Sequence, residues 1–116
     1  PAGFDDTTRS LRSGRREINA SDSRSICDAL QVATPGNITF DINRRLVGDG
    51  LVVTDAEVCD AIRFAFLNLK LVVEPGGAAA LAALLSGKLD TSGKTTAVVV
   101  SGGNIDTELF AEIQRG

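Results

Sequence analysis

The junction between an apolar run and four small residues is the strongest candidate for ligand chemistry. Val98–Val100 passes directly into Ser101–Asn104, whose sequence is Ser-Gly-Gly-Asn. In a parallel α/β sheet, ligands bind beyond the carboxyl ends of the strands, where glycines let the backbone approach closely and a serine hydroxyl can donate or accept a hydrogen bond. A following helix adds free N–H groups at its N-terminus. The alternative is a plain strand-to-helix turn in which Asn104 is the helix N-cap.

A second candidate is the acidic turn Glu74–Gly77, which follows the apolar run Leu71–Val73. A carboxylate at the end of a buried strand is costly unless it is paired or faces a cleft. The alternative is that Glu74 is simply an acid at the start of a helix, where the helix dipole favours it. The glycine spacing matches neither a dinucleotide-binding fingerprint nor a P-loop.

Two adjacent carboxylates near the start of the chain could bind a hard cation. Asp5 and Asp6 follow Phe4, and carboxylate and backbone carbonyl oxygens are the ligands that Mg²⁺ and Ca²⁺ prefer. The same acids could instead cap a helix.

Composition excludes several classes of protein. The chain has 116 residues, enough for one core, and contains no histidine, tryptophan, tyrosine or methionine. Without histidine it lacks the usual general base and the usual zinc ligand, so a hydrolase triad is excluded. The net charge of −3 and the absence of basic clusters argue against nucleic acid or an anionic membrane as a partner. The longest apolar stretch, Ala78–Leu85, is far shorter than the roughly 20 residues that a membrane helix needs.

The two cysteines, Cys27 and Cys59, are too few for a disulfide framework. Both lie among apolar residues, which predicts buried free thiols in a reducing cytoplasm. The chain has three lysines. Lys88 and Lys94 are expected to be solvated in a polar turn, and Lys70 is expected to end a helix.

Start and stop signals predict five helices. The clearest signal is the capping box Thr54–Glu57, which opens a helix that runs to about Lys70. The other helices are expected at residues 5–14, 38–47, 78–85 and 106–114. In the second of these, Ile38, Ile42 and Leu46 share one face because they are four residues apart.

Four short runs predict strands: Glu17–Asn19, Leu51–Val53, Leu71–Val73 and Lys94–Val100. The last is the best of them, and its unbroken apolar end is typical of a parallel strand covered on both faces. Strands that alternate with helices favour an α/β layered domain. Because the strands are few and short, we expect another segment to complete the sheet. Periodicity does not decide the type of Ser25–Leu30.

Together the motifs resemble one enzyme family along the whole chain. Glu74–Ala83 and Val98–Asp106 closely resemble the C-terminal region of the threonine dehydratase and serine racemase family. Pro1–Asp6 is similar to the family's metal-binding loop, and Ser25–Leu30 to its Thr-Ile-Ala-Asp-Gly-Leu segment. The resemblance implies pyridoxal 5'-phosphate (PLP) as cofactor and the fold type of the tryptophan synthase β subunit. Residues 1–116 would then be the C-terminal portion of the large catalytic domain, an α/β fold whose parallel sheet is flanked by helices and is incomplete in this chain.

The resemblance also implies which residues surround the cofactor ring. Ser101 is similar to the serine that hydrogen-bonds the pyridine nitrogen of PLP, which leaves that nitrogen unprotonated and suits β-elimination. Gly102 brings the backbone close beside it, and Glu74 is similar to a glutamate next to the ring. Ala29 occupies a position whose backbone lines the same pocket. Alanine replaces the family's usual glycine there, and a left-handed backbone at Ala29 would cost about 1 kcal/mol.

A divalent cation, Mg²⁺ or Ca²⁺, is implied as well. Phe4, through its carbonyl, and Asp6, through its carboxylate, are similar to two of the cation's three protein ligands. The third ligand, a glutamate, would fall just before Pro1.

The chain offers no match to the family's Schiff-base lysine or to its Gly-rich phosphate loop. We therefore expect no catalytic residue in this chain and no activity from it alone, with the N-terminal half of the same enzyme as its partner. The implied parent reaction converts L-threonine or L-serine to a 2-oxo acid and ammonia. The alternatives are racemisation of serine or a hydroxyaspartate, and a non-catalytic binding module that retains the fold. The resemblance also implies a homodimer, and the sequence after Asp106 predicts no ACT-type regulatory domain.

Overall fold

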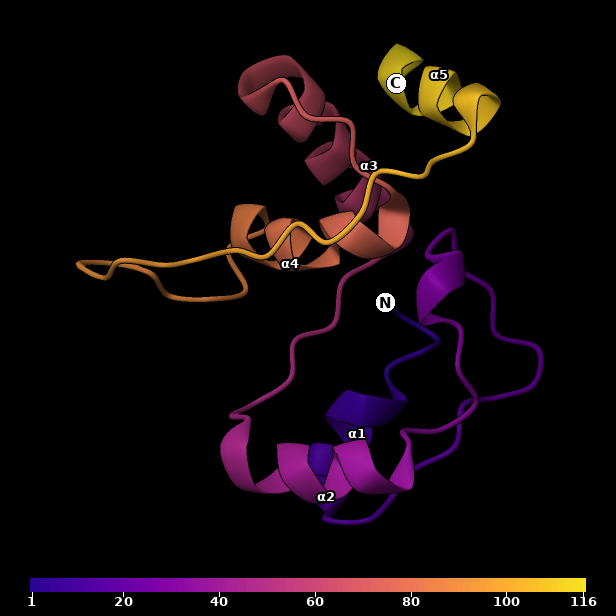
Figure 1. Cartoon of the computed structure of the whole chain (residues 1–116), viewed down its shortest axis with the longest axis vertical. Coiled ribbons are helices and arrows are strands. Elements are labelled where there is room, and N and C mark those ends of the chain that lie inside the picture. Colours follow the sequence, from indigo (N-terminus) through magenta and orange to yellow (C-terminus); the bar gives the residue numbers. More distant parts are fainter.

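The computed structural model describes every residue from Pro1 to Gly116 and contains helices but no β-strand. The α-helices are α1 (Asp6–Ser13), α2 (Asn37–Leu46), α3 (Asp55–Phe64), α4 (Pro75–Leu85) and α5 (Thr107–Arg115). A 3-10 turn, η1 (Asp28–Leu30), precedes α2, and a π-helical segment, η2 (Ala65–Leu69), continues α3. The molecule measures 40 × 39 × 20 Å, a flat slab in which α1 and α2 lie at one end and α3 to α5 at the other (Figure 1).

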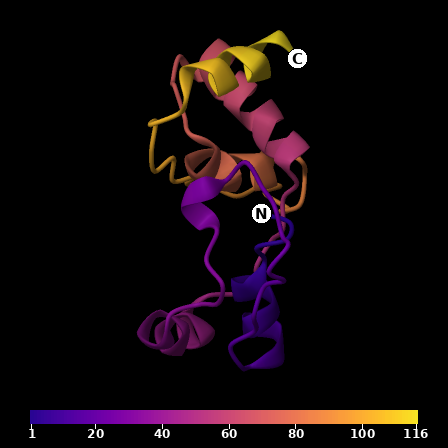
Figure 2. The ribbon, with the colours of Figure 1, turned by 90° about the vertical axis from the view of Figure 1, so that its right-hand side faces the viewer.

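The hydrophobic core lies between α3 and α4, which are neighbours in the half of the molecule away from α1 and α2 (Figure 2). Helix α4 begins with Pro75 at its first position, where the missing N–H costs nothing. Its remaining residues are glycine, alanine and leucine, and small side chains let neighbouring segments pack on several of its sides. The core residues are Cys27, Val53, Val58, Ala61, Ile62, Ala65, Val73, Ala78, Leu81, Ala82, Ala83 and Ile113.

The start of α3 confirms the predicted capping box. The Thr54 hydroxyl accepts a hydrogen bond from the Glu57 N–H at 3.3 Å, and the Glu57 carboxylate accepts one from the Thr54 N–H at 2.7 Å. The same carboxylate pairs with the Lys88 amine at 2.8 Å, and Lys88 is exposed, as expected. This amine and the Thr54 backbone N–H hold the pKa of Glu57 below its usual value. The helix continues through η2 to Lys70, which ends it with a left-handed backbone.

The cap of α5 differs from one of the predictions. The Asp106 carboxylate accepts hydrogen bonds from the N–H groups of Glu108 and Leu109, both at 2.9 Å. Asp106 is therefore the N-cap, and Asn104 is not. A carboxylate is favoured at that position because it satisfies helix N–H groups that have no partner within the helix.

Helix α2 forms where it was predicted, but its apolar face is open to solvent. Ile38 and Leu46 are each 79% exposed, and Ile42 is 45% exposed. The buried residue of α2 is Phe40, and the helix contacts α1. The spacing of the three aliphatic residues thus identified a helix without identifying its packed side.

The four runs predicted as strands are extended but form no ladder. Residues 95–101 take part in no backbone–backbone hydrogen bond, either as donors or as acceptors. Val53 accepts one from Ala2 at 2.7 Å, and Asn19 donates one to Ala33 at 2.9 Å. A β-ladder requires a neighbouring strand, and no two of these runs are paired with each other. The predicted parallel sheet is therefore not seen in this chain.

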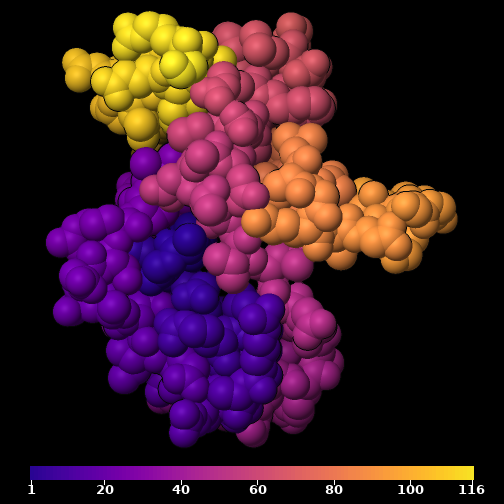
Figure 3. Space-filling view, turned by 180° about the vertical axis from the view of Figure 1, so that it is seen from behind, coloured from indigo at the N-terminus to yellow at the C-terminus, as the bar shows by residue number.

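The last of these runs, residues 94–100, lies along α4 and packs Val98 and Val100 against the core (Figure 1). The turn that joins it to α4 projects from the body as an arm (Figure 3). None of the helices has both the length and the apolar composition required to span a lipid bilayer.

Candidate functional site

The start of α4 and the loop after residue 100 are packed backbone to backbone. A Cβ atom placed on Gly77 would lie 2.8 Å from the Gly102 carbonyl oxygen and 2.9 Å from its nitrogen, whereas ordinary contacts are 3.4–4 Å. A Cβ on Gly103 would lie 2.7 Å from the carbonyl oxygen of Val72. Glycine is required at these positions because two segments of backbone approach each other more closely than any side chain allows.

Glu74 binds this loop with both its backbone and its side chain. Its N–H donates to the Gly102 carbonyl oxygen at 3.0 Å, and its carboxylate oxygen Oε2 accepts from the Asn104 N–H at 3.0 Å. A Cβ on Gly102 would lie within 2.6–2.7 Å of the Glu74 carboxylate. Glu74 stands at the N-cap of α4, yet its side chain does not cap that helix. The carboxylate is thus paired with the loop, although of the run before it only Val73 is buried.

Ser101 lies beside this contact with its hydroxyl free. The residue is exposed, and its hydroxyl makes no hydrogen bond with any other group of the chain. Oε1 of Glu74 likewise accepts no hydrogen bond. Both oxygens are available to a ligand.

The turn that carries Ala29 packs against the same helix start. A Cβ on Gly76 would lie 3.3 Å from the Cβ of Ala29. Lys70 is the chain's one non-glycine residue with a positive φ, so Ala29 has an ordinary backbone and the cost considered for a left-handed alanine does not arise. The four residues predicted to surround the cofactor ring are therefore gathered at one place, the N-terminal end of α4: Ala29, Glu74, Ser101 and Gly102.

Asp55, which sequence reasoning missed, holds the segment before Ala29. Its carboxylate accepts from the Ser25 hydroxyl at 2.6 Å and from the Ile26 N–H at 3.0 Å. The capping-box pattern assigns roles to Thr54 and Glu57 but none to Asp55, so no local signal in the sequence indicates the role of Asp55. Cys27, next along the chain, is buried, and burial raises the pKa of its thiol. It is accordingly a packing residue rather than a nucleophile.

Phe4 and Asp6 lie with Ala29 around a cavity of about 290 Å³. Asp6 is 1% exposed, its Oδ1 accepts from the Asn19 amide at 2.6 Å, and its Oδ2 is buried with no partner. The Phe4 carbonyl oxygen accepts no backbone hydrogen bond. A buried carboxylate oxygen without a donor is costly, and a cation would satisfy it. No group of three or more acidic, cysteine or histidine side chains surrounds a possible metal position.

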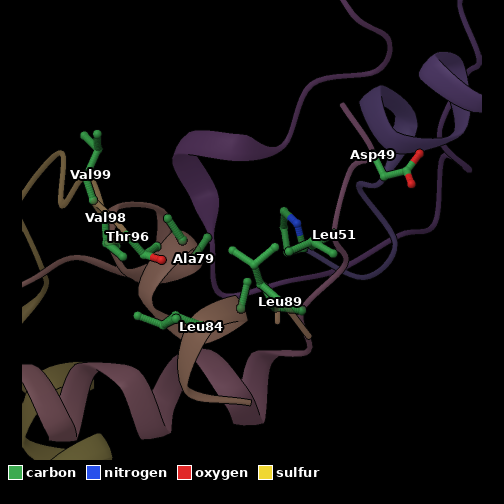
Figure 4. A pocket seen from close by; sticks show the side chains of 13 residues that line it. Asp49, Leu51, Ala79, Leu84, Leu89, Thr96, Val98 and Val99 are labelled. Atoms are coloured by element: carbon green, nitrogen blue, oxygen red, sulfur yellow. The ribbon is translucent and has the colours of Figure 1, made fainter. Parts of the chain in front are cut away.

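A larger cavity of about 500 Å³ lies elsewhere, between two extended runs and α4. In Figure 4, Asp49 and Leu51 border it on one side and Thr96, Val98 and Val99 on the other, with Ala79 and Leu84 of α4 between them. Its lining is mostly apolar and contains none of the residues gathered at the start of α4. Asp49 and Thr96 are the polar side chains of its lining, and walls that are otherwise apolar favour burial of further apolar surface.

The amines of the three lysines have partners outside the candidate site. The Lys70 amine donates to the Leu67 carbonyl oxygen at 2.7 Å, and the Lys94 amine donates to that of Asp90 at 3.0 Å. The Lys88 amine pairs with Glu57.

Known proteins resemble this chain in sequence and in structure. Residues 1–102 match the family model described as pyridoxal-phosphate dependent enzyme. The chain is 39% identical over 104 residues to the L-threonine ammonia-lyase of Thermotoga maritima, covering 90% of this chain and 25% of that protein. It is 37% identical over 116 residues to the L-threo-3-hydroxyaspartate ammonia-lyase of a Pseudomonas species, covering 100% of this chain and 36% of that protein.

Among solved structures, maize serine racemase superposes with a TM-score of 0.84 at 35% identity, covering 97% of this chain and 35% of that one. The chain thus spans between a quarter and about a third of the length of these relatives. The superposition supports the fold type implied by the sequence motifs, although this chain shows no strand of its parallel sheet, and the family takes PLP as its cofactor. The chain belongs to the family of pyridoxal-phosphate dependent enzymes.

Proposed function

We propose that this chain is the C-terminal portion of a PLP-dependent ammonia-lyase that converts L-threonine or L-serine to a 2-oxo acid and ammonia. The observation that carries the proposal is the gathering of Ala29, Glu74, Ser101 and Gly102 at the start of α4, where the Ser101 hydroxyl is free. The names of the relatives agree with this reaction class.

PLP supplies an electron sink for the carbanion formed at the substrate Cα. The contribution of this chain is to hold the ring. The Ser101 hydroxyl would donate a hydrogen bond to the pyridine nitrogen, and because the hydroxyl is a neutral donor it would leave that nitrogen without a proton. The Glu74 carboxylate lies so close to Gly102 that no side chain fits beside that contact. Glu74, whose Oε1 accepts no hydrogen bond within the chain, would lie beside the cofactor.

A divalent cation, Mg²⁺ or Ca²⁺, is held by the Asp6 carboxylate and the Phe4 carbonyl oxygen in this proposal. Support comes from the buried Oδ2 of Asp6, which has no partner, and from the free Phe4 carbonyl. The remaining ligands come from water and from outside these residues.

The reactive lysine and further strands come from the N-terminal portion of the enzyme. All three lysine amines of this chain are occupied elsewhere, which supports a lysine supplied in that way. The unpaired backbone of residues 95–101 and the apolar cavity beside α4 support a parallel sheet that the N-terminal portion completes. Without that portion, we expect the chain to be inactive. A homodimer, suggested by family resemblance, and a cytoplasmic location, suggested by two free thiols, complete the proposal.

A chimera tests the proposal directly. In the Thermotoga maritima L-threonine ammonia-lyase, the region that aligns with this chain is replaced by it. We expect the chimera to show the visible absorption band of lysine-bound PLP and to release ammonia from L-threonine and L-serine, and Ser101→Ala to weaken both. Ser21→Ala, at an exposed serine without a hydrogen-bond partner, is the matched control. A folded chimera that binds no PLP contradicts the proposal, and a stable band from the isolated chain contradicts the missing lysine.

Racemisation of serine or a hydroxyaspartate is the second candidate, because this chain superposes well on maize serine racemase. The same chimera distinguishes the two activities when D-serine is measured beside ammonia. PLP binding with neither product would indicate a non-catalytic module.

A further inference from the structure

The backbone of residues 95–101 has no hydrogen bond that could hold Ser101 from its N-terminal side. On the C-terminal side, three contacts hold the next residues in place. The Gly102 carbonyl oxygen accepts from the Glu74 N–H, the Asn104 N–H donates to the Glu74 carboxylate, and the Glu74 carboxylate fills the space beside the Gly102 Cα. Val98 and Val100 pack against the core, but every hydrogen bond that ties residues 101–104 to a distant part of the chain is made by a single residue, Glu74.

Two of these contacts belong to the side chain, and they depend on each other. The carboxylate can accept from Asn104 at 3.0 Å only if it lies against Gly102, where a Cβ would be 2.6–2.7 Å away. Gly102 has no positive φ, so alanine could adopt its backbone, and the three atoms nearest to the new Cβ all belong to the Glu74 carboxylate, which is the obstacle it meets first. The glycine at position 102 and the glutamate at position 74 thus form a matched pair.

We propose that Glu74 is a positioning residue: its Oε2 clamps the Gly102–Asn104 backbone and so sets the position of the Ser101 hydroxyl. What that hydroxyl does for the cofactor rests on the proposed function. The clamp itself is a property of this chain. It differs from a direct contact between the glutamate and the ring, because it uses Oε2 and acts through Ser101.

Amide hydrogen exchange tests the clamp without any cofactor. In the ¹⁵N-labelled chain, Glu74→Ala is expected to speed exchange at the Asn104 N–H by roughly tenfold or more, because a hydrogen bond to a charged acceptor is lost. Glu74→Gln retains an oxygen acceptor and is expected to keep most of the protection. The Ala78 N–H, which donates to the Glu74 backbone carbonyl, is the internal control and should not change. Unchanged exchange at Asn104 in Glu74→Ala would overturn the proposal.

Gly102→Ala supplies an independent test that does not remove the carboxylate. Its Cβ must displace Oε2, so exchange at Asn104 should again speed up, by a similar factor. In the Glu74→Ala background, Gly102→Ala should add nothing, because the obstacle has gone. An equal effect of Gly102→Ala in both backgrounds would show that the carboxylate does not occupy the site.

The chimera described above links the clamp to the cofactor. Ser101→Ala is expected to weaken PLP binding roughly fivefold, as expected for loss of one neutral hydrogen bond. Glu74→Ala should weaken PLP binding by a similar factor, and combining it with Ser101→Ala should weaken binding no further. Glu74→Gln should bind PLP nearly as well as the unchanged chimera. Additive effects of the two alanine variants would show that Glu74 does not act through Ser101. If no form binds PLP, the proposed function fails, and the exchange measurements still decide whether the clamp exists.

Discussion

The close contact between α4 and the loop after residue 100 predicts an unusual response to Gly77→Ala. Inside a helix, alanine is favoured over glycine by about 1 kcal/mol, so the substitution should stabilise the protein if helix propensity were the whole effect. The new Cβ would instead lie 2.8 Å from the Gly102 carbonyl oxygen and 2.9 Å from its nitrogen, well inside the ordinary 3.4–4 Å. Both atoms are backbone, so neither can move aside by changing a rotamer. Overpacking of this kind costs about 1–3 kcal/mol, and we expect a net loss of about 1 kcal/mol.

Gly76→Ala is the matched control. The helix is the same and the expected propensity gain is equal, but the new Cβ would meet Ala29 at 3.3 Å and Leu30 at 3.5 Å, both through side chains on a separate turn. Urea denaturation followed by circular dichroism gives the free energy of unfolding of both variants. We expect Gly77→Ala to be less stable than Gly76→Ala by about 1–2 kcal/mol. Equal stability of the two variants would refute the inference that the loop backbone fills the space beside Gly77.

Three further predictions concern the rest of the fold. Thr54→Ala removes the hydroxyl of the capping box and should lower the free energy of unfolding by about 1 kcal/mol in thermal denaturation, whereas Thr54→Ser should retain it. The pKa of Glu57 is lowered in the folded chain, so its pairing with Lys88 contributes fully to the stability of the fold above pH 4.5, its ordinary pKa. That contribution is lost as the pH falls through the lowered folded pKa. In Lys88→Ala, the free energy of unfolding should therefore change less with pH below 4.5. Burial raises the pKa of both thiols, but Cys27 is fully buried whereas Cys59 is partly exposed. A small alkylating reagent should therefore label Cys59 first, as measured by mass spectrometry. Labelling of both thiols at the same rate would contradict the packing described for Cys27.

The helices of this protein were predictable because their signals are local. The capping box at Thr54 and the apolar composition of α4 both act within a few residues. Helix α3 formed where expected, and α4 begins at Pro75, three residues earlier than predicted. The predicted strands were not confirmed, because a strand depends on contacts that are not local. A run such as Lys94–Val100 has the composition of a strand, but a ladder depends on a partner that its own sequence does not contain.

The candidate site was predictable only from several motifs considered together. Locally, Glu74 could be a helix-start acid or a site residue, and in the structure it stands at the helix start while its side chain binds the loop 30 residues further on. No local pattern contains that contact. Ile38, Ile42 and Leu46 show the same limit in reverse, because their spacing identified a helix but could not show that Phe40, on another side, is the residue that packs.

The backbone of residues 95–101, which makes no backbone hydrogen bond, affects how this chain behaves in concentrated solution. A short, uncharged, β-branched run with free N–H and C=O groups is the kind of segment from which cross-β fibrils grow. Lys94 is the nearest charge on one side, and the next charge on the other side is Asp106. Copies of this chain held at high concentration should therefore adhere to one another through this run. A strand that pairs with this run would occupy its free N–H and C=O groups and so prevent that self-association. Completion of the sheet should therefore also keep the chain in solution.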